Sequence, residues 1–360
     1  MASGMGKALA GLGMVAVGVA AGVAAERGLI GKKYKEDQQH QEPFGKLRGR
    51  QISVRTTDGI DLYAEVDDPL VTPPDDLAII FCHGYALNQD SFHFQRRDLR
   101  GQATLVFWDQ RSHGRSDKAQ AENISIDQLG DDLYQVIQQV VPNRPIILVG
   151  HSMGGMTVMA FADQHPELFG DDGPVKGVAL LATSSGQLKS ELFGLPSNFA
   201  SRVHNMSPAL TAQAIKYADA IDWGRSYTND LNLMLTNRFS FGSDAPASYG
   251  QFTSDMLNQT TISTVAEFLT ALQNHDKVDA LKTFRNVDTL VMVGEKDVMT
   301  PLEHYSRIVA EVLPEHSQIL ANTGHMLILE RHYDVNAQLL ALVRRVRKGL
   351  AADESKGESV

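Results

Sequence analysis

The residues best suited to chemistry are a serine flanked by small residues, in the sequence Gly-His-Ser-Met-Gly at residues 150–154. The preceding apolar run at residues 145–149 has the β-branched composition of a buried strand, and residues 156–162 are typical of a helix. Strand, G-x-S-x-G and helix in that order indicate a sharp turn that lifts the serine hydroxyl clear of a sheet. Glycines on either side leave room for strand and helix to approach closely. We therefore predict that Ser152 is a nucleophile.

The acid that such a serine requires is expected on a loop that follows a strand. A serine hydroxyl is a weak nucleophile until a base takes its proton, and the base needs an acid that orients it. In an open parallel sheet these groups come from loops at the carboxyl ends of strands. The apolar run at residues 289–293 is followed by Glu295 and Asp297, whereas Asp288 precedes it at the wrong end of the sheet. We predict Asp297 as the acid, with Glu295 as the alternative.

The candidate base is His325, on the loop after a weaker predicted strand at residues 317–321. The chain has 12 histidines, and most of the others are expected on helices or at the surface. His325 is the one that follows a strand and also comes after both Ser152 and Asp297. The resulting chain order of serine, aspartate and histidine is the order expected when the nucleophile stands on a strand-to-helix turn.

Two backbone N–H groups are needed to stabilise the negative oxygen that forms when a serine attacks a carbonyl. Met153 follows the serine at the start of the predicted helix, so its N–H is one expected donor. The other is expected after the apolar run at residues 77–82, where Gly84 lets the backbone turn inward and Tyr85 supplies the N–H. We therefore predict an oxyanion hole formed by Tyr85 and Met153, with His83 in a structural role.

The hydropathy pattern predicts a sheet that is mostly parallel and covered by helices. Residues 51–55 and 60–66 alternate in polarity around Asp58 and Gly59, which indicates a β-hairpin. Continuous apolar runs, typical of strands buried on both faces, alternate with helical patterns and so favour an α/β fold. The predicted strands are residues 77–82, 103–108, 145–149, 177–182, 289–293 and, more weakly, 317–321; the predicted helices include residues 126–141, 301–313 and 329–350.

The alternation of strands and helices stops between residues 184 and 276. This segment shows helical patterns, for example at residues 209–220 and 262–273, and is rich in Ser, Asn, Met and aromatic residues. We interpret it as a helical cap or lid over the ends of the strands, where it would exclude water and shape a pocket. A purely structural insertion is the alternative. The α/β core is then predicted at residues 50–183 and 277–350.

The two ends of the chain are predicted to lie outside the core. Residues 8–25, within an apolar N-terminal segment at residues 1–30, carry no charge and are followed by basic residues. A membrane anchor is the favoured interpretation, a cleaved signal peptide for export is second, and an uninserted segment of a cytoplasmic protein is third. Residues 31–49 are predicted to be a linker, and residues 351–360 a disordered tail.

Composition narrows the function classes. The chain has 360 residues and a net charge of −10, and it lacks the basic face that a nucleic-acid-binding protein needs. Cys82 is the single cysteine, which excludes an internal disulfide and a Cys-rich metal site. It lies within an apolar run, so a buried thiol is expected. The serine chemistry predicted for Ser152 implies no metal and no organic cofactor.

Taken together, these motifs resemble those of the α/β-hydrolase superfamily, in its esterase/lipase-like branch. The resemblance covers residues 50–345 and implies Ser152 as nucleophile, Asp297 as acid and His325 as base. The loop at residues 109–116 is similar to a loop that is usually structural in the family, although Ser112 stands where glycine is common. The matching segments are His83-Gly84, residues 109–116, residues 150–155, residues 294–297 and Gly324-His325.

The resemblance implies a serine hydrolase that cleaves carboxylic esters through an acyl-enzyme intermediate. The apolar, Met-rich insertion favours a small-molecule ester with an apolar or acyl-chain group, as in a monoacylglycerol-lipase-like enzyme. Thioesterase, C–C hydrolase, peptidase and haloperoxidase chemistry use the same triad and are alternatives, as is a non-catalytic membrane-tethered binding protein. Ser152 argues against dehalogenases and epoxide hydrolases of this fold, which carry an aspartate at that position.

Overall fold

The computed structural model describes residues 42–69, 71, 76–186, 188, 236–242 and 245–357. The predicted apolar segment at residues 8–25, most of the predicted linker and the predicted helix at residues 209–220 lie outside this part of the chain. Among the described helices, none combines the length and the apolar character needed to cross a membrane.

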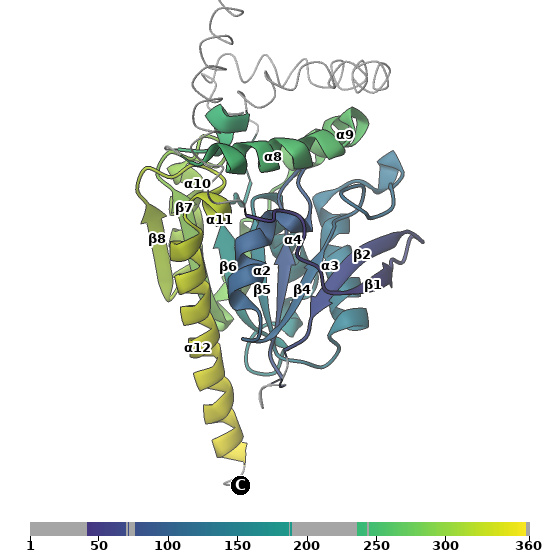
Figure 1. Cartoon of the computed structure of the whole chain (residues 1–360). Helices are drawn as coiled ribbons and strands as arrows, with labels where there is room; N and C mark the ends of the chain where they lie inside the picture. The colour runs from purple at the N-terminus through teal and green to yellow at the C-terminus, as the bar shows by residue number, and fades with distance from the viewer. Residues whose placement is uncertain are drawn as a thin grey trace, which may run out of the picture.

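The described residues form one eight-stranded sheet at the centre of the molecule (Figure 1). The strand order is β1-β2-β4-β3-β5-β6-β7-β8, with β1–β2 and β2–β4 antiparallel and the other neighbours parallel. The predicted hairpin, which lies at one edge, and the five predicted buried strands are confirmed; the weaker predicted strand near residues 317–321 is also present, but most of its residues are only partly buried. The strands are β1 Arg50–Arg55, β2 Asp61–Asp67, β3 Ala78–Cys82, β4 Thr104–Trp108, β5 Ile146–His151, β6 Val175–Leu181, β7 Asp288–Gly294 and β8 His316–Leu320.

Helices cover both faces of this sheet, which explains why its central strands are apolar throughout. On one face, side chains such as Ile80 and Leu148 pack against α3 Ile126–Val140 and α4 Met153–Gln164. On the other face, Phe81 and its neighbours pack against further helices. Those helices are α2 His93–Leu99, α11 Leu327–Glu330 and α12 His332–Gly357, and α10 Leu302–Val312 lies against β7.

The C-terminal helix differs from its prediction. The pattern at residues 329–350 predicts one helix, but the structure divides it at Arg331 into α11 and α12. The helix then continues through Gly357, so residues 351–357 are helical rather than part of a disordered tail. Ala351 and Ala352 have high helix propensity, and they extend a helix that packing has already nucleated.

The described part of the predicted lid consists of helices at one end of the sheet. Residues 236–240 are helical, and they are followed by α8 Ala247–Gln259 and α9 Ile262–Asn274. The helix predicted at residues 262–273 is therefore confirmed. Figure 1 shows α8 and α9 lying across the end of the sheet. The division of the chain into core and lid remains a prediction, because residues 189–235 lie outside the described part.

Candidate active site

The backbone at Ser152 is strained, as the sequence motif predicts. Between β5 and α4, Ser152 adopts φ 54° and ψ −120°, a conformation that L-residues rarely adopt and that the surrounding structure must enforce. A Cβ added at Gly154 would lie 1.9 Å from the Cys82 carbonyl oxygen, and one at Gly150 would lie 2.5 Å from the Gly154 oxygen. Strand and helix can approach this closely only because glycine occupies both positions.

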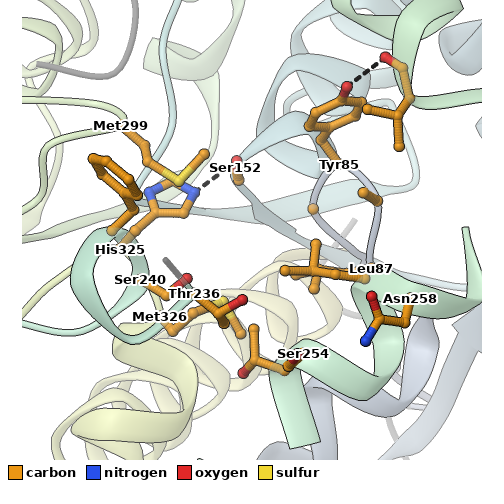
Figure 2. Close-up of a pocket in the computed structure, with 16 residues that line it drawn as sticks. Tyr85, Leu87, Ser152, Thr236, Ser240, Ser254, Asn258, Met299, His325 and Met326 are labelled. Atoms are coloured by element: carbon orange, nitrogen blue, oxygen red, sulfur yellow. Dashed lines mark hydrogen bonds between the residues drawn. The ribbon is translucent and has the colours of Figure 1, made fainter. Parts of the chain in front are cut away.

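The three predicted side chains lie together in one hydrogen-bonded chain. His325 Nε2 lies 2.9 Å from Ser152 Oγ, the contact drawn as a dashed line in Figure 2. His325 Nδ1 lies 2.9 Å from Asp297 Oδ2. Because the carboxylate can only accept, Nδ1 carries the proton and donates it, which leaves Nε2 as the acceptor for the serine hydroxyl. This tautomer is the one a general base requires.

The environment of Asp297 keeps its carboxylate ionised and oriented. Its Oδ1 accepts the backbone N–H groups of Met299 and Thr300 at 2.8 and 2.9 Å, and its Oδ2 accepts the Thr300 hydroxyl at 2.7 Å. Burial by itself raises the pKa of Asp297, but the charge and hydrogen bond of His325 and the hydrogen bonds of Thr300 outweigh it. The pKa of Asp297 therefore lies below its usual value.

Glu295, the alternative acid, points elsewhere. Its Oε2 accepts the backbone N–H of Asn322 at 2.9 Å, so it braces the loop that leads to His325. The sequence favours Asp297 but leaves Glu295 as an alternative, because both residues follow the same strand. The direction of the side chains does separate them, since Asp297 is the one that lies on the imidazole.

The loop predicted to supply an oxyanion donor passes directly beside the nucleophile. A Cβ added at Gly84 would lie 3.3 Å from Ser152 Cβ, so the backbone at Gly84 passes close to the serine. Tyr85 lines the same cavity as Ser152, and Met153 is the first residue of α4. Both predicted donors are thus next to the serine, and their role in binding an oxyanion remains a prediction.

His83 has the structural role that was expected. It is fully buried, its Nδ1 donates to the Gly84 carbonyl at 2.8 Å, and its Nε2 accepts the Gln110 N–H at 2.9 Å. Burial lowers the pKa of His83 to about 3, so the ring is neutral at physiological pH. The imidazole thereby ties the start of the loop at residues 83–87, the predicted oxyanion loop, to the loop that follows β4.

The oxyanion loop is also bound to α8 and α9 of the insertion. The Tyr85 hydroxyl donates to the Val265 carbonyl in α9, as Figure 2 shows. The Thr260 hydroxyl, at the turn between α8 and α9, donates to the Ala86 carbonyl at 3.0 Å. Ala86 has a φ of 56°, which is unfavourable for a residue with a Cβ, so this contact supports a strained position. None of these contacts has a signature in the sequence.

The loop at residues 109–116 supports the site without entering it. Ser112, which stands where glycine is common in the family, has a φ of 61°, and its hydroxyl accepts the Ala119 N–H at 2.9 Å. The serine thus adopts the conformation that glycine favours and adds a hydrogen bond. His113 Nε2 accepts the Ala86 N–H at 3.1 Å, which links this loop to the oxyanion loop.

A cavity of about 280 Å³ lies against Ser152 and His325. One part of its lining comes from the core and the other from the insertion, and both parts mix apolar and neutral polar side chains (Figure 2). The described lining residues are Gly84, Tyr85, Ala86, Leu87, Ser152, Met299, His325 and Met326 from the core, and Thr236, Phe239, Ser240, Thr253, Ser254, Leu257, Asn258 and Val265 from the insertion. Within the described ranges, no group of His, Cys, Asp and Glu side chains is arranged to hold a metal ion.

Comparison with known proteins agrees with this architecture. Epoxide hydrolase 1 of Caenorhabditis elegans is 35% identical over 91 residues, which are 25% of this chain and 22% of that protein. Monoacylglycerol lipase of Mycolicibacterium smegmatis is 28% identical over 92 residues, which are 24% of this chain and 33% of that protein. The matched regions therefore span at most a third of these two relatives.

Solved structures extend the likeness over most of the chain. The esterase EaEST from Exiguobacterium antarcticum superposes with a TM-score of 0.63 at 20% identity, covering 81% of this chain and 98% of that one. At this identity the likeness concerns the fold alone. A family model described as alpha/beta hydrolase fold matches residues 78–332, which is more than half of the chain. The chain therefore belongs to the alpha/beta hydrolase fold family.

Proposed function

We propose that this protein is a serine hydrolase that cleaves carboxylic esters through an acyl-enzyme intermediate. The observation that carries the proposal is the hydrogen-bonded chain from Ser152 through His325 to Asp297, at the wall of a cavity. A hydroxyl, a neutral imidazole and an ionised carboxylate in this order perform acyl transfer in unrelated folds, so the geometry supports the chemistry independently of the family.

The reaction begins when Ser152 Oγ attacks the carbonyl carbon of the ester while His325 Nε2 takes the hydroxyl proton. Asp297 holds the Nδ1–H of the imidazole and stabilises the imidazolium that forms. The backbone N–H groups of Tyr85 and Met153 are proposed to donate to the carbonyl oxygen as it becomes negative. His325 then protonates the leaving alcohol, and a water molecule activated by the same imidazole releases the acid from Ser152.

The cavity favours an uncharged substrate. Apart from His325, its described lining contains no ionisable side chain except the Tyr85 phenol, so a charged substrate would lose hydration without gaining an ion pair there. Leu87, Met299 and Met326 provide apolar contact for an acyl chain or an aryl group. A neutral ester with an apolar group next to the carbonyl fits this lining.

The nucleophile distinguishes this proposal from epoxide hydrolysis, the activity in the name of one matched relative. Opening an epoxide by covalent catalysis in this fold relies on a carboxylate nucleophile, and the position after His151 holds a serine. Ser152 forms an ester that water can hydrolyse with help from His325, which is the chemistry of an esterase.

The test is a substrate panel with a nucleophile variant. Purified protein is assayed on 4-nitrophenyl esters of increasing chain length, on matched thioesters and on anilides. We expect ester hydrolysis that Ser152→Ala abolishes while thermal unfolding is unchanged, and Ser306→Ala on the exposed face of α10 serves as the matched serine control. Undiminished ester turnover by purified Ser152→Ala would reject the proposal. Faster turnover of thioesters or anilides would redirect it to another acyl-transfer reaction.

A further inference from the structure

The backbone just before His325 is held by a carboxylate that is not part of the triad. Glu330, at the end of α11, accepts the Gly324 N–H with Oε2 at 2.8 Å. The same carboxylate accepts the Gly242 N–H at 3.1 and 3.2 Å. Gly324 precedes His325 in the chain, whereas Gly242 belongs to the insertion. One side chain therefore joins the insertion to the loop that carries the base.

The two segments that Glu330 joins are in direct backbone contact. A Cβ added at Gly242 would lie 2.5 Å from the Thr323 carbonyl carbon, and one added at Gly324 would lie 2.6 Å from the Gly242 nitrogen. A Cβ at Gly294, on the strand that leads to Asp297, would lie 2.3 Å from the Thr323 oxygen. Three glycines thus let the loop that carries Asp297, the loop that carries His325 and the insertion meet at one junction, which leaves little freedom of movement there.

A second contact runs across the same junction. The Met326 N–H donates to the Ser240 carbonyl at 2.8 Å, so the residues on both sides of His325 are tied to residues 240–242. Ser240 and Met326 also line the cavity beside Ser152. The wall of the cavity and the position of the imidazole are therefore parts of one connected structure.

We propose that Glu330 is a positioning residue that holds His325 against Ser152 and couples this alignment to the insertion. The inference rests on the proposed function, because it assigns His325 the role of base. The two oxygens of a carboxylate can accept two N–H groups at once. In Glu330→Gln one of these oxygens becomes an NH₂ group, which faces a backbone N–H donor and cannot accept from it. Since displacement of a reacting group by about 1 Å can reduce the rate by about 100-fold, a small shift of the base loop is measurable in kcat.

The first experiment compares Glu330→Gln with Glu303→Gln, a matched change on the exposed face of α10. On the ester that the wild type hydrolyses best, we expect kcat of Glu330→Gln to fall about 10- to 100-fold with KM changed less than about threefold. The rate of Ser152 labelling by a fluorophosphonate should fall in parallel, and Glu303→Gln should match the wild type. A folded Glu330→Gln protein that keeps kcat within about twofold, or that loses only substrate affinity, would overturn the proposal.

A second variant approaches the junction from the insertion. Gly242→Ala leaves the carboxylate in place but forces the two backbones apart. We expect the same selective loss of kcat from this variant, although Gly242 does not line the cavity among the described residues. A folded Gly242→Ala protein with wild-type kcat would argue against the coupling. This variant keeps the question open to test even if Glu330→Gln fails to fold.

A spectroscopic readout separates this inference from the proposed function. The proton that His325 Nδ1 donates to Asp297 should give a downfield proton NMR resonance in the wild type, assigned by its loss in His325→Gln. We expect that resonance to move or broaden in Glu330→Gln. If the wild type neither hydrolyses esters nor reacts with a fluorophosphonate, the proposed function fails, and the resonance still decides on Glu330. An unchanged resonance in folded Glu330→Gln would contradict a positioning role.

Discussion

Thr300 donates its hydroxyl to Asp297 Oδ2 at 2.7 Å, and the same oxygen accepts from His325 Nδ1 at 2.9 Å. The carboxylate is thus held on one side by a loop hydroxyl and on the other by the imidazole. A hydrogen bond to an ionised group contributes about 1.5–3 kcal/mol, so this loop contact fixes the acid in the orientation that the base requires.

Thr300→Val is expected to lower kcat by about 10-fold. The change preserves shape, but it removes one hydrogen bond worth about 1.5 kcal/mol or more from the carboxylate and leaves Asp297 Oδ2 with the imidazole as its partner. Steady-state kinetics at the pH optimum measure the effect, with Thr270→Val on the exposed side of α9 as the control. Equal kcat values for the two variants would show that the hydroxyl does not orient the acid.

Thr260→Val is expected to weaken oxyanion stabilisation without removing any group that touches the substrate. The Thr260 hydroxyl supports the strained backbone of Ala86, next to the proposed donor Tyr85. If the oxyanion loop relaxes, kcat and the affinity for a boronate transition-state analogue should fall together by about threefold to 10-fold. This effect is smaller than the loss of about 100- to 1000-fold in kcat that follows removal of an oxyanion donor. The measurement pairs boronate inhibition constants with kcat and KM. A fall in kcat with unchanged boronate affinity would place the defect elsewhere.

Stability is expected to decline as the pH falls below about 6.5, the ordinary pKa of histidine. Burial lowers the pKa of four imidazoles to about 3 or 4. Between about pH 6.5 and these values, the unfolded chain therefore binds more protons than the folded chain does. As the pH falls from the ordinary pKa of histidine to the pKa in the folded state, each such histidine lowers the free energy of unfolding by about 1.4 kcal/mol per pH unit. Burial raises the pKa of two carboxyls to about 6, and these oppose the trend between about pH 6 and 4. The histidines are His83, His113, His151 and His275, and the carboxyls are those of Asp109 and Asp132.

Chemical denaturation at several pH values measures this trend. On acidification, four imidazoles lower the free energy of unfolding and only two carboxyls raise it. The free energy of unfolding should therefore decrease from pH 6.5 to 4. His113→Gln should show a slope smaller by about one proton in that range. A free energy of unfolding that is constant or rises on acidification over this range would contradict the buried, neutral state of these rings.

Two glycine-to-alanine substitutions should have opposite effects on stability. Gly154→Ala places a Cβ 1.9 Å from a backbone oxygen, so we expect a loss of about 3 kcal/mol or failure to fold. Gly349 lies within α12 with no atom within 4 Å of an added Cβ, so Gly349→Ala should stabilise the protein by about 0.5–1 kcal/mol. Thermal or denaturant unfolding measures both variants. A neutral Gly154→Ala would contradict the close approach of α4 to β3.

The sequence predicts much of the fold and the three triad positions for identifiable physical reasons. Strands buried on both faces are continuous apolar runs, so β3 to β7 could be located directly, whereas β8 is only partly buried and its pattern is weaker. Ser152 follows one such strand between glycines, and His325 is the histidine with the right place after another. Asp297 and Glu295 share one loop, and only the directions of their side chains separate them.

The residues that support the triad could not be predicted, because they act through contacts with distant backbone groups. Thr260 donates to a carbonyl 174 residues away, and Glu330 accepts N–H groups from segments that are 82 residues apart in the chain. Neither contact follows a helical or strand period. The split between α11 and α12 was missed for a similar reason, since both segments have helical patterns and the break depends on the local geometry at Arg331.

The most direct test of the account is to trap the acyl group. Protein mixed with 4-nitrophenyl acetate is quenched during the pre-steady state, digested and analysed by mass spectrometry. We predict a burst of about one nitrophenolate per active site and an acetyl group on Ser152, with both lost in Ser152→Ala and the burst greatly slowed in His325→Gln. Ester turnover with the acetyl group on another residue, or with a burst that Ser152→Ala leaves intact, would contradict the assignment of Ser152 as the nucleophile.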